Sequence, residues 1–299
     1  MLRFSAILIA LALLPLFSWA VDLQPNDIVA PLPDKNYVTL SYSTSEKSRY
    51  YKNGVVYSAA PYSNPIVTTE SEFIRISRSY MVGGMPGISY IQIPYGTIKP
   101  SGSLSAYASD TGMGDTTLAT AIWPYADRDS RTYFGLAAYL STPTGSYFAQ
   151  QAFNMGENRY KSALQMGFQK PIYGDLEGSI AFDTLWFGNN HQCAAVCASA
   201  SNLSLSQKPL YTTQLGLIYK VNPVLTVGAT YFYVTGGATA YNNVDRPDTF
   251  NITQRYLLSA LIHTNIGRFS VQYGRDFDVK NGFMQTSALS IRYVRNFGH

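Results

Sequence analysis

The chain has few charged residues for its length. Asp, Glu, Lys and Arg make up 13% of its 299 residues, about half the ~25% that is usual in soluble domains. Its net charge of +4 is small and evenly spread, which excludes a nucleic-acid partner. Beyond the first twenty residues no window reaches the ~18 apolar residues that a membrane-spanning helix needs. A mean hydropathy of −0.05 likewise argues against a helical membrane protein.

The chain begins with an export signal. Arg3 supplies a positive charge, residues 6–17 are apolar, and Ser18-Trp19-Ala20 places small residues before a cleavage site. We therefore expect a signal peptide over residues 1–20, removed near Ala20. Residues 21–36 hold three prolines and are expected to form an extended periplasmic lead-in. Residues 37–299 are expected to form a single domain.

That domain is built from stretches in which apolar and polar residues alternate. Alternation with a period of two indicates strands that have one apolar and one polar face. The expected strands lie near 38–42, 74–80, 88–96, 115–124, 134–140, 164–168, 176–182, 215–221, 225–233, 256–262, 269–273 and 289–297. The gaps between them alternate in length, and the long loops are expected at about 46–71, up to 114, and at 142–159, 188–208 and 235–253.

Alternating short and long gaps are typical of a β-barrel that is threaded through a membrane. Lipid offers no partner to a bare backbone amide, so a sheet in a bilayer must close on itself. We therefore predict an all-β fold, a transmembrane antiparallel β-barrel of outer-membrane type with about twelve strands. An even strand number puts both chain ends on the side of the short turns. The alternative is a secreted soluble β-protein, in which this alternation of gaps would be a coincidence.

The predicted location fixes the expected partners. These are the lipid of a Gram-negative outer membrane and the machinery that assembles barrels there. That machinery recognises a last strand with alternating aromatic residues. The final strand fits this role up to Phe297, although Gly298 and His299 follow it.

Cysteine and histidine are scarce. Cys193 and Cys197 lie in a long loop, and in an oxidising compartment they are expected to form a disulfide. His191 is nearby, but the spacing matches no zinc signature and a fourth ligand is missing, so no metal is expected. His263 falls in a strand among many serines, which is a weak basis for catalysis. We assign no catalytic residue and no cofactor, and a membrane-embedded hydrolase remains the least favoured alternative.

A set of charged residues falls on the polar, inward faces of the strands. Such residues either line a wet path or pair across the barrel as scaffold salt bridges. The set contains both signs of charge, so it predicts no ion selectivity. Its members are Arg75, Asp115, Asp175, Glu177, Asp183, Arg255, Asp276 and Arg292.

Three short motifs resemble a known family. They are the G-x-GD-x-T-L stretch at 112–118, the P-T-G-x-Y stretch at 143–147 and the N-x-G-x-N stretch at 154–158. Together with Ile93-Pro94-Tyr95-Gly96 they are similar to the outer-membrane protein family named for the MetA pathway of phenol degradation. The resemblance implies an outer-membrane barrel that takes up small hydrophobic molecules and is linked to the breakdown of aromatic compounds.

The motif residues allow two interpretations. Asp115 can cap a turn and the glycines can permit close backbone approach. Alternatively, the loop at 142–159 folds into the mouth, and its Tyr147, Phe148 and Phe153 meet an aromatic solute. The leading functional hypothesis is a passive channel or facilitator for small hydrophobic or aromatic compounds. The alternative is a structural or surface-interaction barrel without transport.

Overall fold

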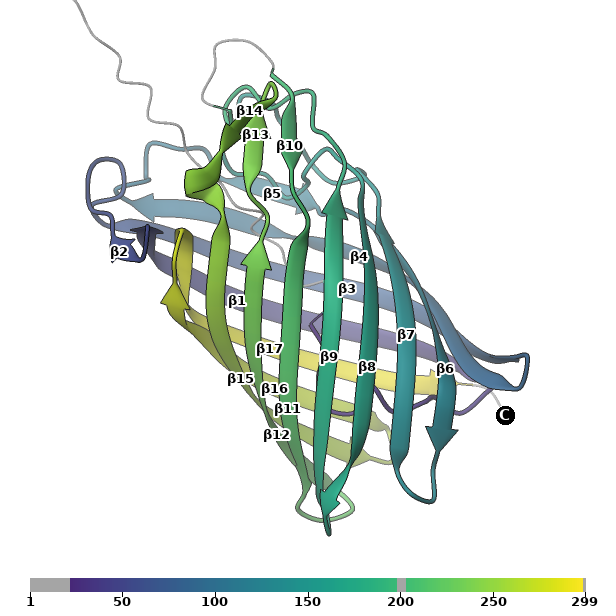
Figure 1. Ribbon diagram of the computed structural model, residues 1–299. Coiled ribbons are helices and arrows are strands. Elements are labelled where there is room, and N and C mark those ends of the chain that lie inside the picture. The colour runs from purple at the N-terminus through teal and green to yellow at the C-terminus, as the bar shows by residue number, and fades with distance from the viewer. Residues whose placement is uncertain (1–21, 198–202, 298–299) are drawn as a thin grey trace, which may run out of the picture.

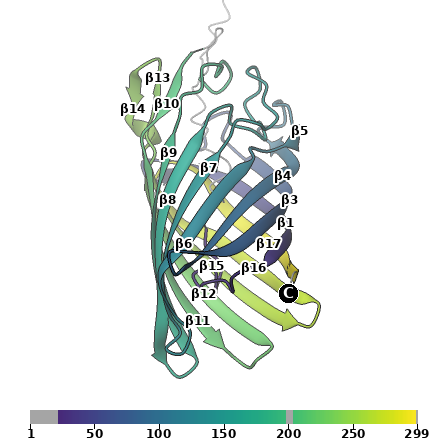
Figure 2. The same cartoon turned by 90° about the vertical axis from the view of Figure 1, so that its right-hand side faces the viewer.

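The computed structural model describes residues 22–197 and 203–297, which form a closed antiparallel barrel of 12 strands (Figures 1 and 2). The predicted fold class is therefore confirmed. The wall strands are β1 (Asn36–Lys52), β3 (Pro65–Val82), β4 (Met85–Gly102), β6 (Thr117–Asp127), β7 (Thr132–Ser141), β8 (Lys161–Tyr173), β9 (Leu176–Phe187), β11 (Leu210–Lys220), β12 (Leu225–Gly236), β15 (Asn251–Thr264), β16 (Gly267–Val279) and β17 (Gly282–Phe297).

The barrel closes where the first strand meets the last. β1 pairs with β17 from Asn36 opposite Phe297 to Tyr51 opposite Gly282. Every other wall strand pairs with the strands before and after it in the sequence. Both ends of the wall therefore lie at the rim that carries the short turns, as the even strand number predicts.

Strand lengths differ from the expectation on the loop side. The loop expected at about 46–71 is much shorter, because β1 continues to Lys52 and β3 begins at Pro65. Above the membrane both faces of a strand meet water, so the alternation of apolar and polar residues fades while backbone pairing continues. The loops also hold the short elements β2 (Val55–Val56), β5 (Asp110–Met113), β10 (Leu205–Gln207), β13 (Thr239–Tyr241), β14 (Val244–Arg246) and the 3-10 turn η1 (Pro247–Thr249).

The two faces of the wall have opposite chemistry. Large apolar side chains stand exposed on the outside, among them Leu40, Ile76, Leu164, Leu217 and Leu258. The inward positions between them are buried and polar, for example Thr39, Ser77, Gln165, Gln214 and Ser259. This is the arrangement that lipid outside and a polar lumen inside require. No helix in the described ranges is long and apolar enough to cross a membrane.

Residues 22–31, ahead of β1, run inside the barrel, and residues 32–35 lead from them to β1, with Leu32 53% exposed. The backbone carbonyl of Ile28 accepts a hydrogen bond from Trp123 Nε1 at 2.6 Å, and the backbone amide of Leu23 donates to Gln214 Oε1 at 3.1 Å. Ile28 and Ala30 pack with Trp123 and Tyr133 in a buried cluster. The segment therefore fills part of the lumen, a placement that its prolines did not reveal.

Candidate functional site

The three sequence motifs meet at the loop-side mouth of the barrel, where two aspartates hold the loop at 142–160. Asp115 accepts hydrogen bonds from the backbone amides of Gly145 and Glu157, both at 3.1 Å. Asp110 accepts one from the amide of Met155 at 2.7 Å and one from Ser146 Oγ at 3.2 Å. These carboxylates accept hydrogen bonds from backbone amides that have no strand partner in the loop. Their first role is therefore to fix the conformation of the loop.

The glycines of the motifs allow two passes of this loop to touch. A Cβ atom at Gly156 would lie 2.7 Å from the carbonyl carbon of Gly145, and one at Gly145 would lie 2.7 Å from the Cα of Gly156. Contacts this short have no room for a side chain on either residue. The glycines of the P-T-G and N-x-G stretches are thus required by the close packing of the two backbone segments.

Glu157 is the centre of a buried charge group in the same loop. Its carboxylate accepts from Lys161 Nζ at 2.5 Å and from Arg159, whose Nη2 lies 2.7 Å away. Burial opposes ionisation, but the charges of Lys161 and Arg159 prevail and hold the pKa of Glu157 at about 2. Glu157 is therefore ionised at any physiological pH.

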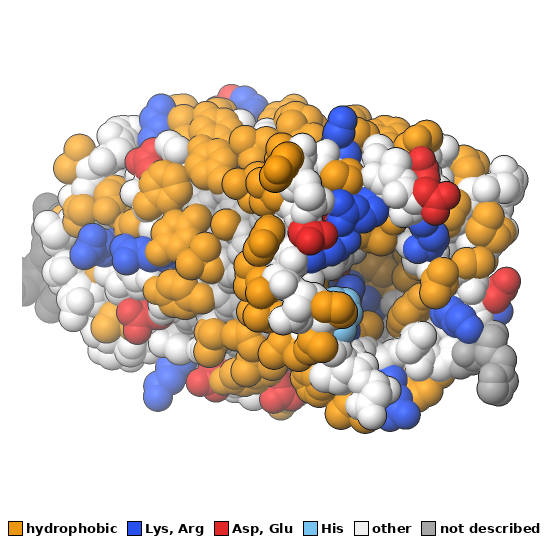
Figure 3. Space-filling model, turned by 90° about the horizontal axis from the view of Figure 1, so that it is seen from below, with side chains coloured by type: hydrophobic (Ala, Val, Ile, Leu, Met, Phe, Trp, Pro, Cys, Tyr) orange, Lys and Arg blue, Asp and Glu red, His pale blue; other side chains and the backbone are white. Residues whose placement is uncertain are grey.

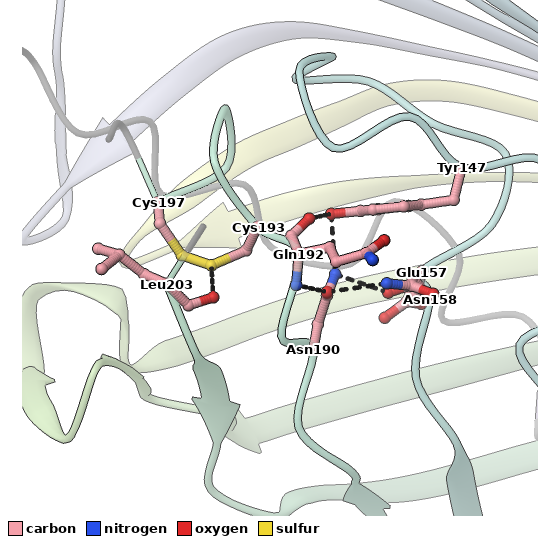
Figure 4. The surroundings of a disulfide bond; sticks show 8 residues. All are labelled: Tyr147, Glu157, Asn158, Asn190, Gln192, Cys193, Cys197 and Leu203. Atoms are coloured by element: carbon pink, nitrogen blue, oxygen red, sulfur yellow. Dashed lines mark hydrogen bonds between the residues drawn. A yellow bond between two sulfur atoms is a disulfide. The ribbon is translucent and has the colours of Figure 1, made fainter. Parts of the chain in front are cut away.

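Tyr147 links this loop to the loop that carries the cysteines (Figure 4). Its hydroxyl donates to the carbonyl of Gln192 at 2.7 Å and accepts from Asn190 Nδ2 at 2.8 Å. Cys193 and Cys197 are joined by a disulfide with a Cα–Cα distance of 5.4 Å. The two loops therefore form one braced structure over the mouth.

The loop aromatics do not line the lumen. Phe153 was expected to meet a solute, but it is fully buried among Val67, Ile98 and Leu104, because the loop needs an apolar core of its own. Phe148 is 53% exposed and is not among the residues that line the cavity.

Below the mouth lies one cavity of about 900 Å³. It is lined by the segment 22–31 and by the inner face of the wall, chiefly that of β1, β3, β4, β6 and β7. Its lining reaches from Asp115 and Glu157 at the mouth to Asn222 and Arg268 at the short-turn rim. Seen from that rim, the surface is hollowed, and cationic side chains and a histidine are visible in the hollow (Figure 3).

The inward charges predicted from the sequence divide into three groups. Arg75, Asp115, Glu177 and Arg292 line the cavity. Asp183, Arg255 and Asp276 are buried on the inner side of the wall but do not line this cavity. The expected position of Asp175 is wrong, because it lies in the turn after β8, where its side chain is 64% exposed and pairs with Arg131 at 3.4 Å.

Half of these eight charges, Asp175, Glu177, Arg255 and Arg292, form salt bridges. Glu177 is only 1% exposed and lies 2.7 Å from Lys220 Nζ, and its other oxygen accepts from Gln169 at 2.6 Å. The acidic residues of the N-terminal segment form salt bridges with basic residues of the wall. Asp22 lies 2.7 Å from Arg255, while Asp27 lies 3.3 Å from Arg292 and 3.9 Å from Arg268.

His263 lines the cavity at the short-turn rim. Its neighbour across the β15–β16 pair is Arg268, a cation that cannot orient a catalytic base. Within residues 22–197 and 203–297 no three His, Cys, Asp or Glu side chains converge as metal ligands would.

Comparison with known proteins places this architecture in a family. The model of the family described as "Putative MetA-pathway of phenol degradation" matches residues 48–293, and the chain belongs to this family. The expected resemblance is thereby confirmed. No curated protein matches the chain.

Two solved structures show the relationship of the fold. An outer membrane channel from Pseudomonas putida F1 is 26% identical, with a TM-score of 0.85 over 92% of this chain and 100% of that one. The β domain of the Bordetella autotransporter BrkA is 8% identical, with a TM-score of 0.52 over 88% of this chain and 100% of that one. The chain is accordingly an outer-membrane β-barrel.

Proposed function

We propose that the protein is an outer-membrane channel through which small hydrophobic or aromatic compounds diffuse passively into a Gram-negative cell. The observation that carries the proposal is the cavity of about 900 Å³ whose lining reaches from the mouth loops to the short-turn rim. Its wall mixes serine and threonine hydroxyls with aromatic rings, a surface that suits a small ring bearing a polar group. Membership of the family and likeness to a channel from Pseudomonas putida F1 support it.

The proposal includes the export of the chain and its insertion into the outer membrane. The leader at residues 1–20, which lies outside the described residues, is cleaved near Ala20. The mature chain is then handed to the barrel-assembly machinery and inserted into outer-membrane lipid. No catalytic step or cofactor is needed for diffusion through a lumen.

A pair of substitutions on β7 tests the channel. Ala137 faces the cavity, whereas Ala138 stands on the outer face beside Leu136 and Leu140. We expect the wild-type protein to conduct ions in planar bilayers and to speed uptake of labelled benzyl alcohol by intact cells. Ala137→Trp should lower both, because the indole fills the path, and Ala138→Trp should leave both unchanged.

The contrary result is equally definite. Folded wild-type protein that neither conducts nor speeds uptake would refute the channel and favour a structural or surface-interaction barrel. If Ala137→Trp and Ala138→Trp change conductance and uptake equally, the solute does not pass through the described cavity.

A further inference from the structure

Arg75 is a charged group on the cavity wall whose side-chain hydrogen-bond partner is an amide, Gln92. It projects from β3 into the cavity, and its guanidinium donates to Gln92 Oε1 through Nε at 3.0 Å and Nη2 at 2.6 Å. In the described part of the chain it forms no salt bridge with a carboxylate, unlike Arg255 and Arg292. A cation held in place by a neutral amide keeps its attraction for an anion.

Aromatic rings surround this guanidinium. Its Cζ lies 4.2 Å from the ring centroid of Tyr90 and 5.3 Å from that of Phe73. Arg292 also lies near the ring of Phe73, with its Cζ 6.0 Å from the centroid. Stacking on Tyr90 fixes the plane of Arg75, so its remaining N–H groups are presented to the lumen in a fixed direction.

The charge balance around these rings is positive. Arg292 and Arg268 share the single carboxylate of Asp27, which lies 3.3 Å and 3.9 Å from them. With Arg75 the group holds three guanidinium ions and one carboxylate. An uncharged solute would leave this excess uncompensated, whereas a solute with one negative charge would reduce it.

From this arrangement we infer that Arg75, Gln92, Tyr90 and Phe73 form a binding site for the carboxylate of a small aromatic acid in transit through the lumen. The carboxylate takes a fork of N–H donors from Arg75, and the ring of the solute lies against the tyrosine and phenylalanine. The inference rests on the proposed channel function and narrows its cargo from aromatic compounds in general to their carboxylated members.

Equilibrium binding to the folded, full mature protein in neutral detergent tests the site without requiring transport. The probes are benzoate, benzyl alcohol, which keeps the ring without the charge, and acetate, which keeps the charge without the ring. We expect calorimetry to show saturable binding of benzoate and at least about tenfold weaker binding of the other two.

Variants assign the effect to Arg75. Arg75→Gln should weaken benzoate binding by about tenfold or more and leave benzyl alcohol unchanged, and Arg75→Lys should restore part of the loss. The matched control is Arg78→Gln, which removes the same charge from the same strand at an exposed position on the outer face. Faster gel migration of unheated samples shows that each variant is folded.

The possible outcomes distinguish failure of the Arg75 site from failure of the proposed channel function. Conductance that Ala137→Trp lowers, together with benzoate binding no tighter than that of benzyl alcohol, would overturn the site and leave the channel standing. Equal losses in the Arg75→Gln and Arg78→Gln variants, or no recovery with lysine, would also overturn it. Selective benzoate binding without conductance would preserve the site and refute the channel.

Discussion

Glu157 is a single residue whose charge stabilises the mouth loops. Its carboxylate is shared by Lys161 and Arg159, and Arg159 is only 4% exposed. Glu157→Gln would leave two cations together in a buried place, which by analogy with other broken ion pairs costs about 3–5 kcal/mol. We expect the amides of the loop at 142–160 to lose protection in hydrogen-exchange measurements while the wall strands keep theirs.

Acid should produce the same effect in the wild-type protein. The pKa of Glu157 is lowered from 4.5 to about 2, so its contribution to stability is complete above about 4.5 and is lost as the pH falls toward 2. Glu70→Gln, which neutralises an exposed carboxylate on β3, is the control and should leave the loop protection unchanged. Unaltered protection in Glu157→Gln would show that the loop is held without this charge group.

How far single residues could be predicted depends on what surrounds them. Sequence alternation identifies Arg75 and Arg292 as inward-facing, and they line the cavity. It fails for Asp175, because parity ceases to apply at a turn. It fails also for Phe153, since a loop can bury an aromatic ring in a core of its own. Asn190, which joins Tyr147 to Asn158, carried no recognisable signal.

At the scale of elements, the N-terminal segment 22–31 has the largest consequence for a channel. It occupies one side of the lumen and is held by Asp22 to Arg255 and by Asp27 to Arg292. A variant lacking residues 22–31 should therefore have a larger single-channel conductance, because the cavity gains the space the segment leaves. It should also show stronger dependence on the charge of the ion, since the wall arginines lose their partners.

Planar-bilayer recordings check this prediction against Asp34→Asn, which changes a carboxylate between this segment and β1 that is 71% exposed. That control should conduct like the wild-type protein. Identical conductance of the shortened chain would mean that the segment does not obstruct the path.

The elements show where sequence patterns carry information. Strands that cross lipid keep a strict apolar face, so all twelve could be predicted near their centres. Their extensions into water, such as the loop-side ends of β1 and β3, have no such face, so the pattern predicts a loop there. The inward course of residues 22–31 could not be predicted, because their contacts are with residues such as Gln272, far away in the sequence.

At the scale of the whole molecule, the even strand number predicts an orientation. The long loops should face the outside of the cell and the short turns the periplasm. In a background without Cys193 and Cys197, Val244→Cys in a loop element and Ile266→Cys in a short turn offer two exposed sites of 66% and 53%. A membrane-impermeant maleimide should label the first in intact cells and the second only after lysis. The reverse labelling pattern would show that the barrel has the opposite orientation in the membrane.

The lumen position of Asp22 has a practical consequence for any labelling study. A fluorophore or spin label joined to the chain just ahead of Asp22 would report from within the pore, beside Arg255. It would thus sense a passing solute directly, whereas a bulky affinity tag at the same place would have to displace the segment or obstruct the route. For purification, the opposite end of the chain, beyond Phe297 at the rim of the wall, is the safer attachment point.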